Sequence, residues 1–370
     1  METMTYRTNP GVDPHVDVWE WQIPIYLFLG GLAAGILVIG AVAGLTRSKS
    51  WNRTLAAWGA LAAILMLSLG MLALFLDLTH KWYVYRFYLA FRPASPMSWG
   101  AWILLLAYPA MGLLLLGSLS REQWEGLVKR FALLRWLGGL RKLAVDRENA
   151  VLWLSLITGI SLGTYTGILL QTLVARPLWN SGLLGPLFLA SGISGAAAFL
   201  ILIERARELA RRSSGDGIRV PGAEGQGTAS SDAGSGRSSP DVSKHDSSGC
   251  GRLRRDGCRL SLLRWDVGAL AVEAVLLGLL LVEKAGGPQV DRLSAGLLLS
   301  GPFSGSFFGL VVLGGIAVPL AMEIAELARG HARTGLAAPL LVLAGGFSLR
   351  AVLVAAGLMS SFAMLAEGIA

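Results

Sequence analysis

The stretch GGFSLRAVLVAAG, residues 345–357, contains one charged residue, Arg350, and residues 334–366 around it contain no other charge. A helix needs about 20 predominantly apolar residues to cross the hydrocarbon core of a bilayer. An isolated arginine at that depth costs at least about 2.5 kcal/mol, so it is rare unless it faces a partner, a cavity or a substrate. The stretch therefore predicts a membrane-spanning helix whose one cation points into a polar contact inside the protein.

The whole composition agrees with a membrane protein. Charged residues make up 15% of the chain and hydrophobic residues 54%, whereas about 25% of residues are charged in an ordinary soluble domain. Two apolar stretches are each interrupted by one charge, Glu273 within 267–282 and Arg350 within 334–366. Six further intervals contain no Asp, Glu, Lys or Arg: 21–46, 54–76, 93–120, 149–175, 177–203 and 293–322. We therefore predict an all-α membrane protein with eight transmembrane helices.

The distribution of basic residues predicts the orientation, because cytoplasmic loops carry an excess of Lys and Arg. If the N-terminus lies outside, the inner loops hold 24 of the 32 Lys and Arg residues and the outer segments hold 7, with Arg350 as the remainder. Both termini are then outside. The net charge of +8 is explained by topology, so it gives no reason to expect a nucleic-acid partner.

A weak internal repeat predicts how the helices group. Residues 72–77 resemble residues 278–283, and Pro96-Met97-Ser98 resembles Pro302-Phe303-Ser304. Both offsets span four helices and keep the same orientation, as in parallel repeats, although chance similarity among Leu- and Gly-rich helices is an alternative. We predict two four-helix bundles, 1–175 and 176–370. The second contains a Ser- and Gly-rich insertion, about 213–260, whose composition is typical of disorder.

An amphipathic pattern stands in the predicted inner loop after the third helix. Residues 124–137 place apolar side chains at three- and four-residue spacing with basic residues between them, which suits a helix lying on the inner leaflet. A short extension of the third transmembrane helix is the alternative.

Histidine and cysteine positions argue against a redox metal in this protein. Membrane haem needs histidines on facing helices, and His15, His80, His245 and His331 form no such pair. Cys250 and Cys258 fall in the insertion with a spacing that matches no iron–sulfur or zinc pattern. We expect no metal site, no haem and no iron–sulfur cluster.

Polar residues collect at the predicted outer edge. Asp77 follows 23 residues without a charge, and His80 stands three residues later, before an aromatic and basic run, 81–88. An ordinary interfacial belt explains the aromatic residues by themselves, since Trp and Tyr gather at headgroup depth. A carboxylate beside a histidine, however, is suited to relaying protons, so we consider Asp77 and His80 candidate catalytic residues.

Four segments together resemble the NrfD/PsrC family, the integral membrane subunits of polysulfide-reductase-type complexes. They are WEWQIPIYLFLGGLAAG at 19–35, LDL at 76–78, PMSWGAW at 96–102 and GTYTG at 163–167. The resemblance implies an eight-helix subunit without haem in the cytoplasmic membrane of a bacterium or archaeon. It also implies a quinone site, for menaquinone or ubiquinone, near the outer surface of the first bundle. Tyr165 matches a family tyrosine that contacts the quinone, and Glu20 and Gln22 are the nearest candidates for the family's polar residues at the start of the first helix.

The resemblance further implies partner subunits. A ferredoxin-like iron–sulfur subunit would dock on the outer face, with a molybdopterin enzyme or a multihaem cytochrome beyond it. Two other classes stay open from the residues themselves. One is an inert membrane anchor, which would not need Asp77, Tyr165 or Arg350. The other is a secondary transporter, which would also show repeats, Gly-interrupted helices and buried charges such as Glu273 and Arg350. We also expect Glu273 and Arg350 to form a buried pair or share a polar network, with a proton path through the second bundle as its functional extension. The alternative is that each is satisfied separately, with Arg350 on backbone carbonyls and Glu273 as a protonated acid.

Overall fold

The computed structural model describes residues 21–47, 53–78, 80–89, 91–92, 95–173, 175–213, 246–329 and 335–360. Within these ranges the structure is helical and contains no strand. Eight of the described helices are long and apolar enough to cross a membrane, which confirms the predicted number. They are α1 (Gln22–Leu45), α2 (Arg53–Asp77), α4 (Pro96–Ser118), α7 (Glu148–Gln171), α8 (Leu184–Ser213), α9 (Asp246–Gly286), the composite helix Ser304–Arg329 and α13 (Ala337–Met359).

The composite helix changes its winding along its length. It begins as α11 (Ser304–Ser306), continues as the π-helical segment η3 (Phe307–Ala317) and ends as α12 (Val318–Arg329). Shorter elements connect the long helices: η1 (Lys81–Tyr83), α3 (Tyr85–Leu89), α5 (Arg121–Arg130), η2 (Ala132–Leu137), α6 (Gly138–Asp146) and α10 (Gln289–Leu299).

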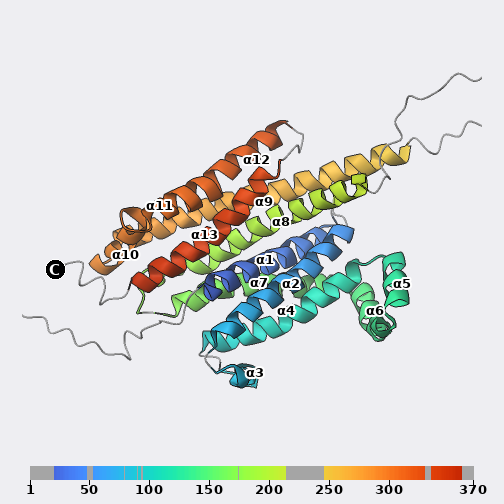
Figure 1. Ribbon diagram of the computed structural model, residues 1–370, viewed down its shortest axis with the longest axis horizontal. Helices are drawn as coiled ribbons and strands as arrows, with labels where there is room; N and C mark the ends of the chain where they lie inside the picture. Colours follow the sequence, from blue (N-terminus) through green and yellow to red (C-terminus); the bar gives the residue numbers. More distant parts are fainter. Residues whose placement is uncertain are drawn as a thin grey trace, which may run out of the picture.

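The long helices lie side by side in one elongated molecule (Figure 1). Helices α1, α2, α4 and α7 pack on one another, and α8, α9, α12 and α13 form a second set. The two sets are in extensive contact, since α8 packs against both α1 and α7 and α13 also reaches α1. The division at residue 175 into two separate bundles stays a prediction.

The two ends of the elongated molecule differ in the elements they hold. At one end, which we call the pocket end, α1 begins, α2 ends and α3 lies (Figure 1). At the other, the insertion end, α8 ends and α9 begins. Because the helices cross an even number of times, Gln22 and Met359 lie at the same end, the pocket end.

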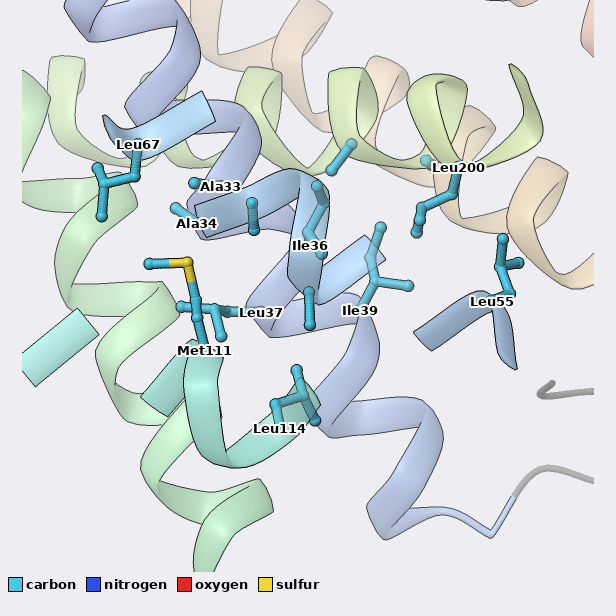
Figure 2. Packing of buried hydrophobic residues seen from close by; sticks show 14 of the residues in the cluster. Ala33, Ala34, Ile36, Leu37, Ile39, Leu55, Leu67, Met111, Leu114 and Leu200 are labelled. Carbon is cyan, nitrogen blue, oxygen red and sulfur yellow. The ribbon is translucent and has the colours of Figure 1, made fainter. Parts of the chain in front are cut away.

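The first set is built around α1, which is the most central helix. Buried apolar side chains from four helices surround it, and Figure 2 shows Leu55 and Leu67 of α2, Met111 and Leu114 of α4 and Leu200 of α8 around Ile36 and Leu37. Lipid tails are as apolar as these side chains, so close packing rather than water exclusion holds such helices together.

Glycines bring α1 and α8 into close contact. A Cβ atom added at Gly35 would overlap the carbonyl oxygen of Gly192, and one added at Gly192 would lie 2.6 Å from the carbonyl oxygen of Gly31. Small residues at a helix interface allow backbones to approach in this way. This contact joins the two helix sets at mid-depth.

The segment after α4 forms a separate helix. α4 ends at Ser118, Leu119 is extended, and α5 starts with a capping box in which the Ser120 hydroxyl accepts from the Gln123 amide at 3.2 Å. The structure therefore does not continue α4 into the loop. It also does not form one amphipathic helix over 124–137, because α5 ends at Arg130, the backbone of Phe131 is not helical, and η2 follows.

The helix α9 starts earlier than its composition indicates. It begins at Asp246, inside the segment for which a disordered insertion is predicted, and residues 214–245 of that insertion lie outside the described residues. Cys258, which the composition places in the insertion, is 2% exposed and packs with Leu200 and Leu262. Packing against α8 orders this part of α9, which composition averaged over Ser- and Gly-rich neighbours does not reveal.

Candidate functional site

A cavity of about 590 Å³ opens at the pocket end of the first helix set. Side chains from α1, α2, α3, α4 and α7, together with Leu78 and Val84 from the turns, line it. Most of them are apolar, among them Ile23, Leu27, Met71, Leu74, Phe75, Met97, Leu104, Leu169 and Leu170. This volume falls within the usual range of small-molecule sites, which are mostly apolar with a few placed polar groups.

Five polar side chains reach this cavity, and two of them are predicted site residues. Tyr165 of α7 is 6% exposed, and Asp77 is half-buried at the last position of α2. The other three are Tyr26 of α1, Ser68 of α2 and Tyr88 of α3. Tyr26 interacts electrostatically with both Tyr165 and Tyr88, so three phenol groups from three elements face one apolar space.

The position of Tyr165 depends on a glycine of the neighbouring helix. A Cβ atom added at Gly100 of α4 would overlap the end of the Tyr165 ring, at Cζ and Oη. The absence of a side chain at residue 100 therefore leaves the space that the phenol occupies. Gly100 belongs to the segment 96–102, one of the four that resemble the family. The need for space beside Tyr165 explains why that segment has a glycine at residue 100.

Tyr88 lies outside the membrane-spanning helices, on α3. Partial burial, and after it the electrostatic influence of Tyr108, raises the pKa of Tyr88 above its ordinary value. A phenol with a raised pKa stays protonated at neutral pH. Tyr88 is therefore a hydrogen-bond donor toward the cavity.

Two other predicted site residues, His80 and Gln22, do not line the cavity. His80 is exposed in the turn after α2, with its ring centroid 6.3 Å from that of Tyr83. Gln22 lies one helical turn before Tyr26, and its buried amide oxygen accepts no hydrogen bond from the described residues. Glu20 lies outside the described residues.

Sequence reasoning missed Tyr26 and Tyr88 as site residues. Tyr26 stands inside the segment 19–35, and Tyr88 belongs to the aromatic run 81–88, which is equally typical of an interfacial belt. The spacing of Gln22 and Tyr26, four residues apart, places them on one helix face, and this is the signal that could have found Tyr26.

Arg350 is 1% exposed and holds three helices together. Its Nε donates to the carbonyl oxygen of Leu27 at 3.1 Å, and its Nη2 donates to that of Phe188 at 3.2 Å. Its Nη1 donates to the carbonyl oxygen of Gly346 at 2.8 Å and to the Ser191 hydroxyl at 3.0 Å. Because the side chain of Leu27 lines the cavity, Arg350 also fixes one part of the cavity wall.

Glu273 of α9 is buried near this arginine. The Glu273 carboxyl group interacts with the Ser191 hydroxyl, which accepts from Arg350, and with the charge of Arg350 itself. Among the described residues no ion pair closer than 4.0 Å joins the two side chains. Ser191 therefore connects Glu273 to Arg350, while the backbone carbonyls take most of the arginine's hydrogen bonds.

Known proteins resemble this one over about half of its length. The family described as "Polysulphide reductase, NrfD" matches residues 8–218. A chain of the polysulfide reductase of Wolinella succinogenes is 32% identical over 189 residues, which cover 50% of this protein and 58% of that one. Protein NrfD of Escherichia coli is 32% identical over 201 residues, covering 52% of this protein and 61% of that one.

A third relative comes from another reductase. A subunit of the selenate reductase of Mesobacillus selenatarsenatis is 29% identical over 211 residues, covering 50% of this protein and 47% of that one. The matched part thus spans about half to three fifths of the length of these relatives. The family match includes α1, α2, α4 and α7, the helices that form the cavity with α3, and it covers more than half of the sequence. This chain is a multi-pass membrane protein and belongs to the NrfD polysulphide reductase family.

Proposed function

We propose that this protein is the quinone-reactive membrane subunit of a respiratory oxidoreductase complex. The observation that carries the proposal is the cavity at the pocket end, where Tyr26, Tyr88, Tyr165 and Asp77 face an otherwise apolar space. Relatives named as parts of polysulfide and selenate reductases support a role within a reductase complex.

The cavity suits a quinone in both shape and chemistry. A quinone head has an apolar ring that needs apolar walls and two ring oxygens that need hydrogen-bond donors. The apolar side chains of α1, α2 and α4 meet the first need, and the phenol groups of Tyr165, Tyr26 and Tyr88 meet the second. About 590 Å³ is enough for a ligand of this size.

The residues of this protein then have distinct tasks. Bound quinol supplies two electrons and two protons. Tyr165, Tyr26 and Tyr88 orient the ring oxygens, and Asp77 at the cavity wall accepts a proton. His80, exposed three residues beyond Asp77, passes protons to solvent, and its imidazole is suited to this because its ring nitrogens can both accept and donate a proton. For a complex that reduces quinone the same groups work in the opposite direction.

The cavity's position also bears on where a partner docks. It lies at the end of the helices beside α3, where Trp82 is 91% exposed and Tyr83 and Tyr85 are about half exposed. We propose that this end faces outside, as the excess of Lys and Arg in the other loops favours. A ferredoxin-like iron–sulfur subunit docked there would take electrons over a short path, with a molybdopterin or multihaem subunit beyond it.

Removing the Tyr165 hydroxyl should slow quinone turnover several-fold without disturbing assembly. Tyr165→Phe deletes one donor from an apolar site and empties little volume, and a lost hydrogen bond is worth roughly 0.5 to 1.5 kcal/mol. Asp77→Asn and His80→Ala should slow turnover at least as much, because they remove the proton acceptor and the exit to solvent. The measurement is quinol oxidation by the assembled complex in membranes.

The matched control is Tyr83→Phe, an exposed tyrosine beside the cavity that does not line it. It should keep wild-type turnover. An inert anchor predicts that all four variants turn over normally, and that result would move the quinone site to another subunit.

The purified protein should carry quinone and no haem. No histidine lines the cavity, and His80 is the only histidine within the described residues. Solvent extraction followed by chromatography should recover quinone from the wild-type protein. A stoichiometric haem Soret band in the isolated subunit contradicts this proposal.

A further inference from the structure

A second set of buried acidic residues lies away from the cavity, between α8, α9 and α12. Asp266 of α9 and Glu323 of α12 are both 0% exposed. They lie toward the insertion end: at 1.5 Å per residue, Asp266 is about 10.5 Å along α9 from Arg259, and Glu323 is about 9 Å along α12 from Arg329. Both positions fall outside residues 8–218, the part that the family match covers. The proposed quinone chemistry does not use them.

The two carboxyl groups contact each other, and three of their four oxygens lack donors. Asp266 and Glu323 are in side-chain hydrogen-bonding contact. The Ser194 hydroxyl of α8 donates to Asp266 Oδ1 at 2.6 Å. No donor among the described residues reaches Asp266 Oδ2 or either oxygen of Glu323. Since ionised carboxylates can only accept hydrogen bonds, the contact requires a proton on one of the two groups.

The surrounding charges do not remove this requirement. Within the described part of the protein no Lys or Arg forms an ion pair with Asp266 or Glu323. Electrostatic interactions join Glu323 to Glu326 on α12 and Asp266 to Glu273 on α9, both acidic, and Glu273 in turn interacts with Arg350 of α13. Two buried like charges in contact cannot both ionise, so one shared proton leaves the pair with a single negative charge.

Polar side chains lead away from the pair in both directions. Toward the insertion end, Glu326 stands one turn along α12, and an ion pair joins Arg259 of α9 to Glu208 of α8 at 3.2 Å. Glu204 and Arg205 of α8 lie at the same end. Toward mid-depth, Ser194 and Ser191 are one turn apart on α8, and Ser191 contacts Arg350 and Glu273.

We propose that Asp266 and Glu323 form a proton-binding site that holds one exchangeable proton, taken up from the insertion end of the second helix set. On uptake, one carboxylate oxygen binds H⁺ and becomes a hydroxyl that donates to the other carboxylate, and no electron moves. Ser194 holds Asp266 in place, and the Ser194–Ser191 turn connects the site to Glu273 and Arg350. The proposal does not depend on quinone binding at the other end of the molecule.

Labelling with dicyclohexylcarbodiimide, an apolar carbodiimide, tests the site in the full-length protein in native membranes. This reagent adds the O–H of a protonated carboxylic acid across its C=N bond, so it marks buried acids that carry a proton. Mass spectrometry of the wild-type protein should find the adduct on Asp266 or Glu323. The adduct should decline as pH rises, because the shared proton is then lost.

Two amide variants separate a shared proton from two independent ones. In Asp266→Asn or Glu323→Gln the new amide donates to the remaining carboxylate, so that carboxylate no longer needs a proton. Labelling should therefore disappear from both positions in either variant. The matched control, Glu283→Gln on the same helix, removes an acid that already accepts from Ser181 at 2.7 Å, and the adduct should persist.

Infrared spectroscopy of the wild-type protein gives the second readout, which requires neither a variant nor reagent access. A carboxylic acid C=O band that shifts in D₂O and fades with rising pH supports the site. Absence of that band at every pH overturns the proposal, whether or not an adduct forms. Labelling that survives at one residue when the other is replaced by its amide also overturns it.

Discussion

Replacing Arg350 by methionine is expected to remove most of the assembled protein from the membrane. The guanidinium is the donor to three backbone carbonyl groups and to Ser191, and it lies between α1, α8 and α13. Its loss leaves the Glu273 carboxyl group without a nearby cation. Removing one partner of a buried charged network typically costs about 3 to 5 kcal/mol, which is a large part of a typical stability of about 5 to 15 kcal/mol.

Two further variants test why Arg350→Met loses assembled protein. Arg350→Lys keeps the charge but has one nitrogen for acceptors on three helices, so it should assemble at an intermediate level. Arg53→Met breaks an exposed ion pair with Glu148, whose N–O distance is 2.9 Å, and should cost at most about 1 kcal/mol. Assembly is measured as folded protein recovered from membranes and as the thermal unfolding midpoint in mild detergent.

A double-mutant cycle then tests whether Glu273 and Arg350 depend on each other. If Ser191 couples them, Glu273→Gln combined with Arg350→Met should be milder than the sum of the single losses, by roughly 0.5 to 3 kcal/mol. Strictly additive losses would show that Arg350 acts through its backbone contacts alone.

Adding one methyl group at residue 100 is expected to lower quinone turnover on the order of tenfold or more, a change of about 1.4 kcal/mol. The Cβ atom of Gly100→Ala would occupy the space of Tyr165 Cζ and Oη. The phenol must then leave its position, and its ring must move within the cavity. The effect should exceed that of Tyr165→Phe, because it displaces the whole ring rather than removing one hydroxyl. Solvent extraction of the purified variant should also recover less quinone than the wild type gives.

The same helix offers a matched control. Gly112→Ala also adds a methyl group to α4, but nothing lies within 4 Å of the new Cβ atom, so turnover and bound quinone should stay at wild-type levels. In a Tyr165→Leu background, which lacks the outer ring atoms, Gly100→Ala should cause little further loss. Equal activity of the Gly100 and Gly112 variants would contradict the steric role of Gly100.

The sequence alone determined the class of the fold and the number of helices. A run of more than 20 residues without a charge is a local property of the sequence. Such a run forms a membrane-spanning helix wherever it occurs, because burying charged side chains in lipid is costly. The same reasoning marked Arg350 and Glu273 as buried, because each is the one charge within an apolar stretch, 334–366 or 267–282. The motif around Tyr165 and the charge of Asp77 after a long apolar helix marked two side chains that the structure brings to one cavity.

Only the tertiary structure decided which faces of the helices meet. The central helix α1 is apolar on nearly all sides, so hydrophobic periodicity does not tell its inner face from its outer one. Contacts between residues far apart in sequence set the rotation instead, such as Gly35 against Gly192 and Gly100 against Tyr165. For this reason Tyr26 and Tyr88 were found on the cavity wall by the structure and not by the sequence.

The burial of Asp266 and Glu323 was likewise decided by the tertiary structure and not by the sequence. In the sequence Asp266 stands just before the apolar stretch 267–282, and Glu323 stands just after the charge-free interval 293–322, so each reads as a charge at a helix end. In the structure α9 and α12 continue past these residues, and packing against α8 and against each other buries both carboxyl groups. Local composition records where charges become frequent, whereas burial depends on which neighbours cover a side chain, and only the packed helices supply those neighbours.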